Sequence, residues 1–155
     1  MAGPLKSGKV QTTSKISNKK VAIIVAEWNE EITEPLYNGA LQTLLQNGFK
    51  ATHLIRKNVP GTFELSLAAL WMAEKKNIDA VICLGCVIQG ETPHFDYICQ
   101  AVAYGITEAS LKTRKPVIFG VLTTLNKQQA VDRSGGKYGN KGEEAALTAI
   151  KMMEF

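Results

Sequence analysis

The segment from Ala80 to Asp96 constrains the fold most. It reads Ala-Val-Ile-Cys-Leu-Gly-Cys-Val-Ile-Gln-Gly-Glu-Thr-Pro-His-Phe-Asp, and its first nine residues are all apolar or small. Such a run, rich in β-branched residues, predicts a strand covered on both faces, as is typical of a central strand in a parallel sheet. Gly90 and Pro93 break this strand, and His94 begins a helical pattern that continues to about Ala109. A strand that leads through a loop into a helix N-terminus is a typical anion site.

Strands and helices alternate along the rest of the chain. Apolar runs predict further buried strands at residues 20–26, 49–59 and 116–124, of which the second is less apolar and therefore nearer the sheet edge. Amphipathic patterns predict helices at residues 29–48, 63–76, 127–132 and 142–153, with Asn29 and Asn126 as helix caps. Pro35 would delay the regular part of the first helix to Thr33. The alternation predicts a doubly wound α/β sandwich with right-handed crossovers.

Charge and hydropathy argue against several classes of protein. The first twenty residues contain five lysines and no acidic residue, which leaves 13 basic and 14 acidic residues elsewhere, a balance of −1. The net charge of +4 therefore belongs to this N-terminal segment, and four of its five lysines lie in an expected flexible arm, residues 1–19, before a single domain at residues 20–155. Nucleic-acid binding is not expected. Because neither a membrane-spanning run nor a signal peptide is evident, we expect a cytoplasmic protein without membrane contact.

The cysteines and one of the two histidines are interpreted as structural. Cys83, Cys86 and Cys99 are an odd number of thiols, which argues against a disulfide framework. Cys83 and Cys86 have C-x-x-C spacing, but residues three apart on a strand face opposite sides and cannot grip one metal ion. We expect no metal site and interpret both as small buried hydrophobic residues. His53 lies within a predicted strand and is expected to be structural.

Candidate functional residues follow each predicted strand, at residues 28–29, 62–64, 89–94 and 123–126. In a parallel sheet these positions meet at the carboxyl edge, where doubly wound folds bind ligands. Neither G-x-G-x-x-G nor G-x-x-x-x-G-K follows the first strand, so a redox cofactor is not expected.

Five segments together resemble the 6,7-dimethyl-8-ribityllumazine synthase family: Trp28-Asn29, Val59-Pro-Gly-Thr-Phe-Glu64, Leu84 to Phe95, Pro116 to Thr124 and Asp132 to Ala146. The resemblance extends over about residues 20–153. It implies a flavodoxin-like three-layer αβα sandwich around a four-stranded parallel sheet. It also implies condensation of 5-amino-6-ribitylaminouracil with 3,4-dihydroxy-2-butanone 4-phosphate, without cofactor or metal, in the penultimate step of riboflavin biosynthesis. Members assemble as pentamers or as cages of twelve pentamers, with active sites between adjacent subunits and a possible association with riboflavin synthase.

The resemblance assigns roles that the residues alone would not carry. His94 would otherwise be an ordinary residue at a helix start, but in this loop it is expected to carry protons, since imidazole exchanges them near neutral pH. Arg133 would otherwise be a solvated charge, and is expected to anchor the phosphate with the backbone amides of Glu91 and Thr92. Trp28 is expected to stack on the pyrimidine ring. The remaining expected substrate-binding residues are Asn29, Thr62, Phe63, Glu64, Cys86, Val87, Ile88, Phe119 and Lys141, the last being equally compatible with a solvated charge.

Two other functions stay open at this point. One is a flavin- or nucleotide-binding module on the same sandwich, and the other is a non-catalytic shell protein, which would have no evident need for His94, Arg133 and Glu64 at one edge. Assembly is open too, although the short loop at residues 134–141 favours a cage over free pentamers. Ser66 and Glu27 depart from residues common in the family, and neither touches the expected chemistry directly.

Overall fold

A four-stranded parallel sheet forms the centre of the molecule, in the order β2-β1-β3-β4. The computed structural model describes residues 16–155, so most of the expected arm at residues 1–19 lies outside the described residues. The strands are β1 (Val21–Ala26), β2 (Leu54–Val59), β3 (Ala80–Ile88) and β4 (Val117–Thr124). Their positions confirm the predicted sheet, with β2 at one edge and β3 in the interior.

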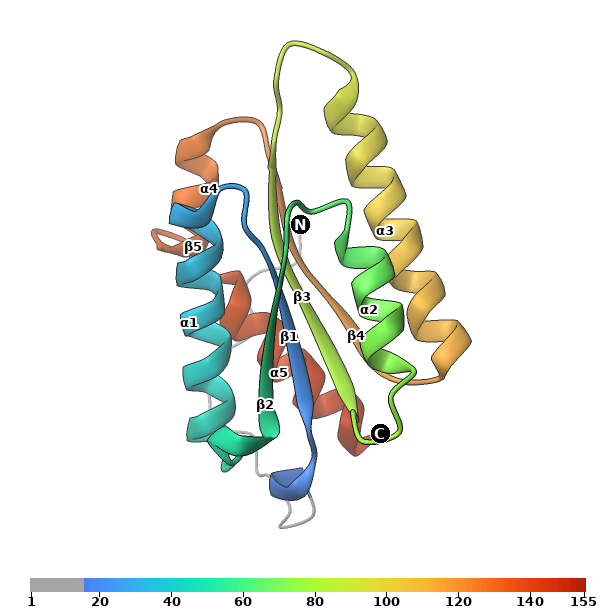
Figure 1. The fold of residues 1–155 in the computed structure, drawn as a ribbon. Helices are drawn as coiled ribbons and strands as arrows, with labels where there is room; N and C mark the ends of the chain where they lie inside the picture. The colour runs from blue at the N-terminus through green and yellow to red at the C-terminus, as the bar shows by residue number, and fades with distance from the viewer. Residues whose placement is uncertain (1–15) are drawn as a thin grey trace.

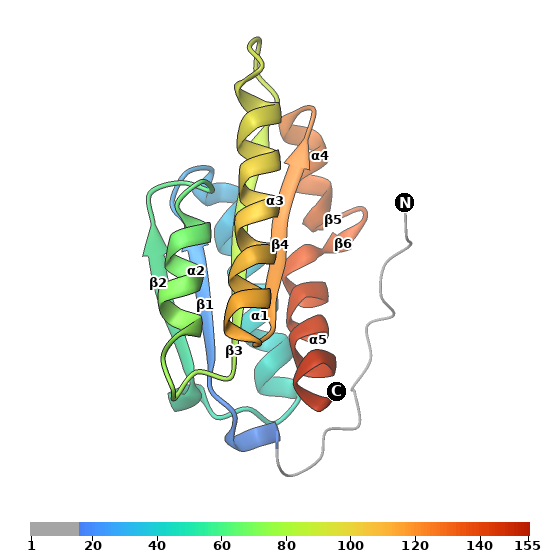
Figure 2. The same cartoon turned by 90° about the vertical axis from the view of Figure 1, so that its right-hand side faces the viewer.

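Helices cover both faces of this sheet, which gives the predicted three layers (Figure 1). One face is covered by α1 (Glu30–Gln46), α5 (Lys141–Glu154) and the short α4 (Lys127–Arg133), and the other by α2 (Leu65–Ala73) and α3 (His94–Thr113). In the view turned by 90°, α2 and α3 lie side by side in front of the sheet (Figure 2). Within residues 16–155, every helix is too short or too polar to cross a membrane.

Two hydrophobic clusters, one on each face, explain why β1 and β3 read as unbroken apolar runs. Ile23 and Ile82 point to the face of α1 and α5, whereas Ile24 and Val81 point to the face of α2 and α3. All six residues of β1 are buried. Because successive side chains of a strand point to opposite faces, a strand buried on both must be apolar throughout. Cys86 and Cys83 fall into different clusters, as their strand spacing predicts.

Several element boundaries differ from the prediction. The predicted strand at residues 49–59 begins only at Leu54, because residues 51–53 form a 3-10 turn (Ala51–His53) that contains His53. Helix α1 begins at Glu30 although Pro35 lies inside it, so the predicted later start at Thr33 is wrong. Helix α2 is shorter than predicted, and α3 continues to Thr113. The predicted loop at residues 134–141 contains a small antiparallel hairpin of β5 (Ser134–Gly136) and β6 (Gly139–Asn140).

The two asparagines that were predicted as helix caps act differently. Asn126 has an extended backbone, and its side chain accepts a hydrogen bond from the Gln129 N–H, which confirms the predicted cap of α4. Asn29 has a left-handed backbone (φ 61°), and its side chain makes no capping bond to α1. The prediction of a side-chain cap at Asn29 is therefore wrong, because capping requires an extended backbone that turns the side chain over the first helical turn.

A buried hydroxyl in α1 gives a prediction for stability. Thr33 is fully buried, and its Oγ1 has no hydrogen-bond partner among the described residues. A buried polar group without a partner costs free energy, so Thr33→Val, which keeps the shape, should raise the free energy of unfolding by about 1 kcal/mol. Thermal unfolding at fixed protein concentration measures the shift. Thr148→Val is the matched control, because the Thr148 hydroxyl donates to the Glu144 carbonyl (2.8 Å) and its loss should give no gain. A lower melting temperature for Thr33→Val would contradict the expectation.

Candidate active site

The loops that follow the parallel strands meet at the carboxyl edge of the sheet, at the top of Figure 1. The loop between β3 and α3 projects furthest and ends at His94, the first residue of α3. Glu91, Thr92 and His94 are exposed in this loop and helix start. Their backbone and side chains are therefore accessible to a ligand at this edge.

Trp28 is held at this edge by the chain that follows β2. The Glu27 N–H donates to the Val59 carbonyl (2.9 Å), and the Trp28 N–H donates to the Pro60 carbonyl (3.1 Å). A Cβ atom at Gly61 would lie 3.3 Å from the Trp28 ring, so the missing side chain lets the indole lie close against the backbone. The indole nevertheless remains 71% exposed. A rigidly held, exposed aromatic face can stack on a planar ligand.

Glu64 is oriented by the same loop. Its Oε2 accepts a hydrogen bond from the Gly61 N–H (3.0 Å), which fixes the carboxylate at the start of α2. Phe63, beside it, is 54% exposed. Glu64 is exposed as well. This pair can present one acceptor and one apolar face to a ligand.

Asn29 and Thr62 converge on one backbone atom of β3. The Asn29 Nδ2 donates to the Cys86 carbonyl (3.1 Å), and the Thr62 Oγ1 donates to the same oxygen (3.3 Å). These bonds join the loops after β1 and β2 to the end of β3. Val87 and Ile88, the last residues of β3, are partly exposed directly beyond this point.

Arg133 is the last residue of α4, which follows β4 and is joined to the start of α1 by an ion pair between Lys127 and Glu31 (2.7 Å). Its guanidinium donates to the Gln129 carbonyl (3.2 Å) and lies 4.9 Å from the centre of the Tyr138 ring. Lys137 places its Nζ 5.1 Å from the same ring. Tyr138 was not predicted as a functional residue. The one feature of the sequence that could have indicated a role for Tyr138 is its position as a single aromatic residue among the glycines of the loop at residues 134–141.

Lys141 begins α5 and is paired with Glu144 at 2.9 Å. This pair is partly exposed and so contributes little to stability. The Lys141 charge is thus partly neutralised within the chain.

Phe119 lies apart from the other predicted site residues. It is the third residue of β4 and pairs with Cys83, whereas Ile88, at the carboxyl edge, pairs with Thr124. Five residues along a strand correspond to about 16 Å. The chain thus brings Trp28, Asn29, Thr62, Glu64 and the end of β3 together, but leaves Phe119 within β4, away from this edge.

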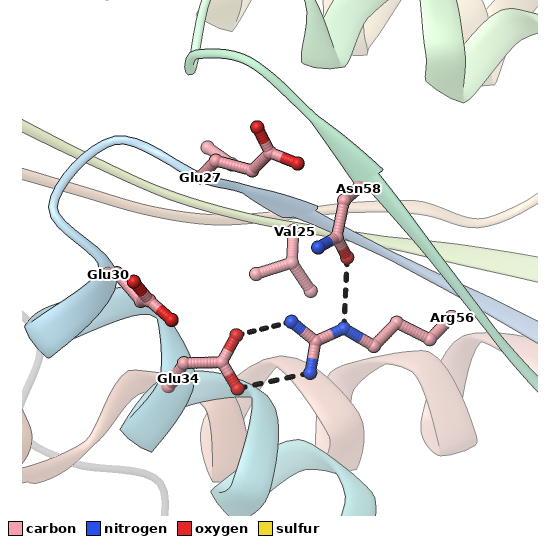
Figure 3. Close-up of a pocket in the computed structure, with 7 residues that line it drawn as sticks. Val25, Glu27, Glu30, Glu34, Arg56 and Asn58 are labelled. Carbon is pink, nitrogen blue, oxygen red and sulfur yellow. Dashed lines mark hydrogen bonds and ion pairs between the residues drawn. The ribbon is translucent and has the colours of Figure 1, made fainter.

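A polar pocket of about 290 Å³ lies beside the loop after β1, between that loop, α1 and β2 (Figure 3). The Arg56 guanidinium binds both carboxylate oxygens of Glu34, donates to Asn58 (2.9 Å) and lies 4.3 Å from the centre of the Tyr37 ring. The hydrogen bond to Glu34 raises the pKa of Arg56. The bonds of Arg56 join α1 to the edge strand β2. Because they occupy the guanidinium, Arg56 offers no free positive charge to an anionic ligand in this pocket.

The two buried thiols near the site, Cys83 and Cys86, have raised pKa values. Burial raises the pKa of Cys83 to about 12, and burial together with the nearby Glu31 carboxylate raises the pKa of Cys86 to about 12. Neither thiol is therefore ionised at neutral pH, which argues against a nucleophilic role. Within the part of the chain that the structure describes, no group of three or more His, Cys, Asp or Glu side chains is placed to hold a metal ion.

These raised pKa values predict slow thiol modification. Only a thiolate reacts with iodoacetamide, and the folded protein keeps Cys83 and Cys86 protonated at about pH 8.5, where an unfolded cysteine is half ionised. Peptide mass spectrometry after a timed reaction should find both residues largely unmodified in folded protein and fully modified in concentrated urea. Equal rates in the two states would contradict the burial of these thiols.

Comparison with known proteins gives one consistent family. Residues 18–155 match the sequence family described as 6,7-dimethyl-8-ribityllumazine synthase. The chain is 68% identical to the protein of that name from Cytophaga hutchinsonii over 138 residues, covering 89% of this chain and 87% of the relative. It is 57% identical to that of Porphyromonas gingivalis over 133 residues (86% and 83% covered) and 55% identical to that of Parabacteroides distasonis over 139 residues (90% and 87%).

Proposed function

The chain belongs to the 6,7-dimethyl-8-ribityllumazine synthase family, and on that basis we propose which residues at the carboxyl edge carry out its reaction. The enzyme acts in riboflavin biosynthesis, where it condenses 5-amino-6-ribitylaminouracil with 3,4-dihydroxy-2-butanone 4-phosphate to form 6,7-dimethyl-8-ribityllumazine. The main support for the proposed site is that Trp28, Glu64 and His94, which lie far apart in the sequence, are exposed at one edge of the sheet.

We assign the pyrimidine substrate to the ends of β1, β2 and β3. The Trp28 indole stacks on the heterocycle, and Phe63 closes the site from the start of α2. The Glu64 carboxylate accepts hydrogen bonds from the ribityl hydroxyls, since a fixed carboxylate is a strong acceptor for a polyol. The backbone of Ile88 bonds the edge of the heterocycle, with Cys86, Val87, Asn29 and Thr62 beside it.

The phosphorylated ketone is assigned to the β3–α3 loop and the α4–α5 segment. The backbone amides of Glu91 and Thr92 and the forked guanidinium of Arg133 bind the phosphate, for which a planar and permanently charged group is well suited. Lys141 supplies a further charge when it is not held by Glu144. His94 transfers protons during imine formation and phosphate elimination. The reaction is proposed to need no cofactor or metal.

The position of Phe119, away from the edge that carries Trp28, supports a site shared between adjacent subunits. Large apolar side chains remain exposed in the single chain, among them Leu67, Trp71, Tyr97, Tyr104 and Leu111 on α2 and α3. An apolar groove of about 400 Å³ lies along α2, next to Trp71. Exposed apolar surface of this extent is typical of an interface. We therefore propose a cytoplasmic homo-oligomer, either a homopentamer or an icosahedral cage of pentamers, which could associate with riboflavin synthase.

The phosphate assignment predicts a selective effect at Arg133. Arg133→Ala should raise the KM for 3,4-dihydroxy-2-butanone 4-phosphate at least about tenfold and change the KM for the pyrimidine much less, since only the ketone carries the anion. Arg133→Lys is the matched control, because it keeps the charge but loses the fork and should fall between wild type and Arg133→Ala. Steady-state kinetics with each substrate varied in turn measure both constants. Equal increases for the two substrates would remove the phosphate role from Arg133.

The shared site predicts complementation between two defective chains. His94→Ala should lower turnover about ten- to a thousandfold, because proton transfer is lost while substrate alignment is kept. Co-expressing His94→Ala chains with Arg133→Ala chains in equal amounts should place two intact halves at about one quarter of the junctions, if neighbours are chosen at random. Activity should then recover to roughly a quarter of wild type. Native mass spectrometry confirms that the assemblies are mixed. If their activity is only the average of the two parent variants, both residues belong to one site on one chain.

A further inference from the structure

The carbonyl oxygen of Cys86 lies where β3 has lost one of its neighbouring strands. The β1–β3 pairing ends at Val25 and Leu84, whereas the β3–β4 pairing continues to Ile88 and Thr124. Residues 85–88 therefore have β4 on one side but no strand on the other. Backbone groups that point to this open side need other partners.

The direction of each backbone group in β3 follows from its alternation. The Val81 N–H donates to the Pro116 carbonyl (2.9 Å), and the Gln89 N–H donates to the Thr124 carbonyl (2.8 Å), so odd-numbered residues direct their backbone groups toward the β4 side. Residues of even number direct theirs toward the β1 side. Cys86 and Ile88 are the two even-numbered residues beyond the end of the β1–β3 pairing.

We propose that Asn29 and Thr62 are positioning residues that replace the missing strand beside β3. By holding the Cys86 carbonyl, they fix the next pair of open-side groups, the N–H and C=O of Ile88, at the place where the heterocycle binds. The inference deepens the proposed function and rests on its assignment of the pyrimidine to the end of β3. The heterocycle then bonds the open side of β3 at Ile88, two residues beyond Cys86, where Asn29 and Thr62 bond the same side of the strand.

Two local features direct the side chains of Thr62 and Asn29 to the Cys86 carbonyl. Thr62 is only 5% exposed, and a Cβ atom at Gly85 would lie 2.7 Å from its Oγ1, so a glycine is needed to let the hydroxyl approach β3. Asn29 has a left-handed backbone, and its side chain bonds to β3 in place of capping α1. Asparagine tolerates this conformation better than most residues, which gives a reason for its presence other than helix capping.

A purely structural role makes a different prediction from a positioning role. Loss of a structural bond lowers stability and affects both substrates alike. Loss of the strand substitute displaces the Ile88 backbone, so binding of the pyrimidine weakens while the phosphorylated ketone, held elsewhere, is bound as before. The two cases are separated by the KM values of the two substrates.

Thr62→Val removes the hydroxyl and keeps the shape. We expect it to raise the KM for 5-amino-6-ribitylaminouracil about five- to tenfold, with kcat and the KM for the ketone phosphate within about twofold of wild type. Thr62→Ser, which keeps the donor, should restore the wild-type KM. Thr33→Val is the matched control, because it removes a buried hydroxyl that binds nothing among the described residues and lies outside the site. Sedimentation and thermal unfolding verify that each variant is folded and assembled.

Asn29→Gly provides an independent test, since glycine keeps the left-handed backbone available and removes only the amide. It should raise the same KM, and titration calorimetry should show weaker binding of 6,7-dimethyl-8-ribityllumazine to both Thr62→Val and Asn29→Gly. The positioning role would be overturned if the KM for the pyrimidine were unchanged in both variants. It would also be overturned if the KM values of both substrates rose equally and Thr62→Ser did not restore them. A wild-type protein that forms no lumazine would instead overturn the proposed function itself.

Discussion

Burial of β3 on both faces is the constraint on which the rest of the structure depends. It pairs with β1 from Ala80 to Leu84 and with β4 from Val81 to Ile88, so the strand is fixed before its end reaches the surface. The loop to His94 and the backbone of Ile88 therefore start from a rigid support. A site built on a buried strand keeps its geometry far better than one built on a free loop.

The other half of the proposed site depends on a close contact between α1 and α5. The Asn140 side chain donates to the Pro35 carbonyl (2.9 Å) and accepts from the Gly142 N–H (2.8 Å), which joins the hairpin to α1. Gly39 leaves the space that this side chain occupies, since a Cβ atom there would lie 2.6 Å from it. Backbone approach of this kind is available only to glycine. The hairpin that carries Tyr138 toward Arg133 is thereby held to the core.

The sequence predicted what depends on local pattern and missed what depends on distant contacts. The apolar run of β3 and the cap at Asn126 are local, and both were confirmed. The bond from Asn29 to Cys86 joins residues 57 positions apart, so nothing near Asn29 distinguished it from an ordinary cap. The ring of Tyr138 beside Arg133 likewise requires the hairpin to form first. The roles of the site residues came from motif resemblance, because exposed side chains such as His94 have no local pattern that assigns chemistry.

The reaction itself explains why so much of this edge consists of hydrogen bonds between protein groups. An amine and a ketone are already reactive, so holding them in the correct geometry supplies more of the rate than any one acid or base, and intramolecular alignment can be worth about 7–11 kcal/mol. Alignment requires rigid supports, and here these are backbone bonds from Trp28 to Pro60 and side-chain bonds to Cys86. If the phosphate lies on a neighbouring subunit, the same argument extends across the interface. Assembly then becomes part of the alignment, because the distance between the two substrates is set by how the subunits pack.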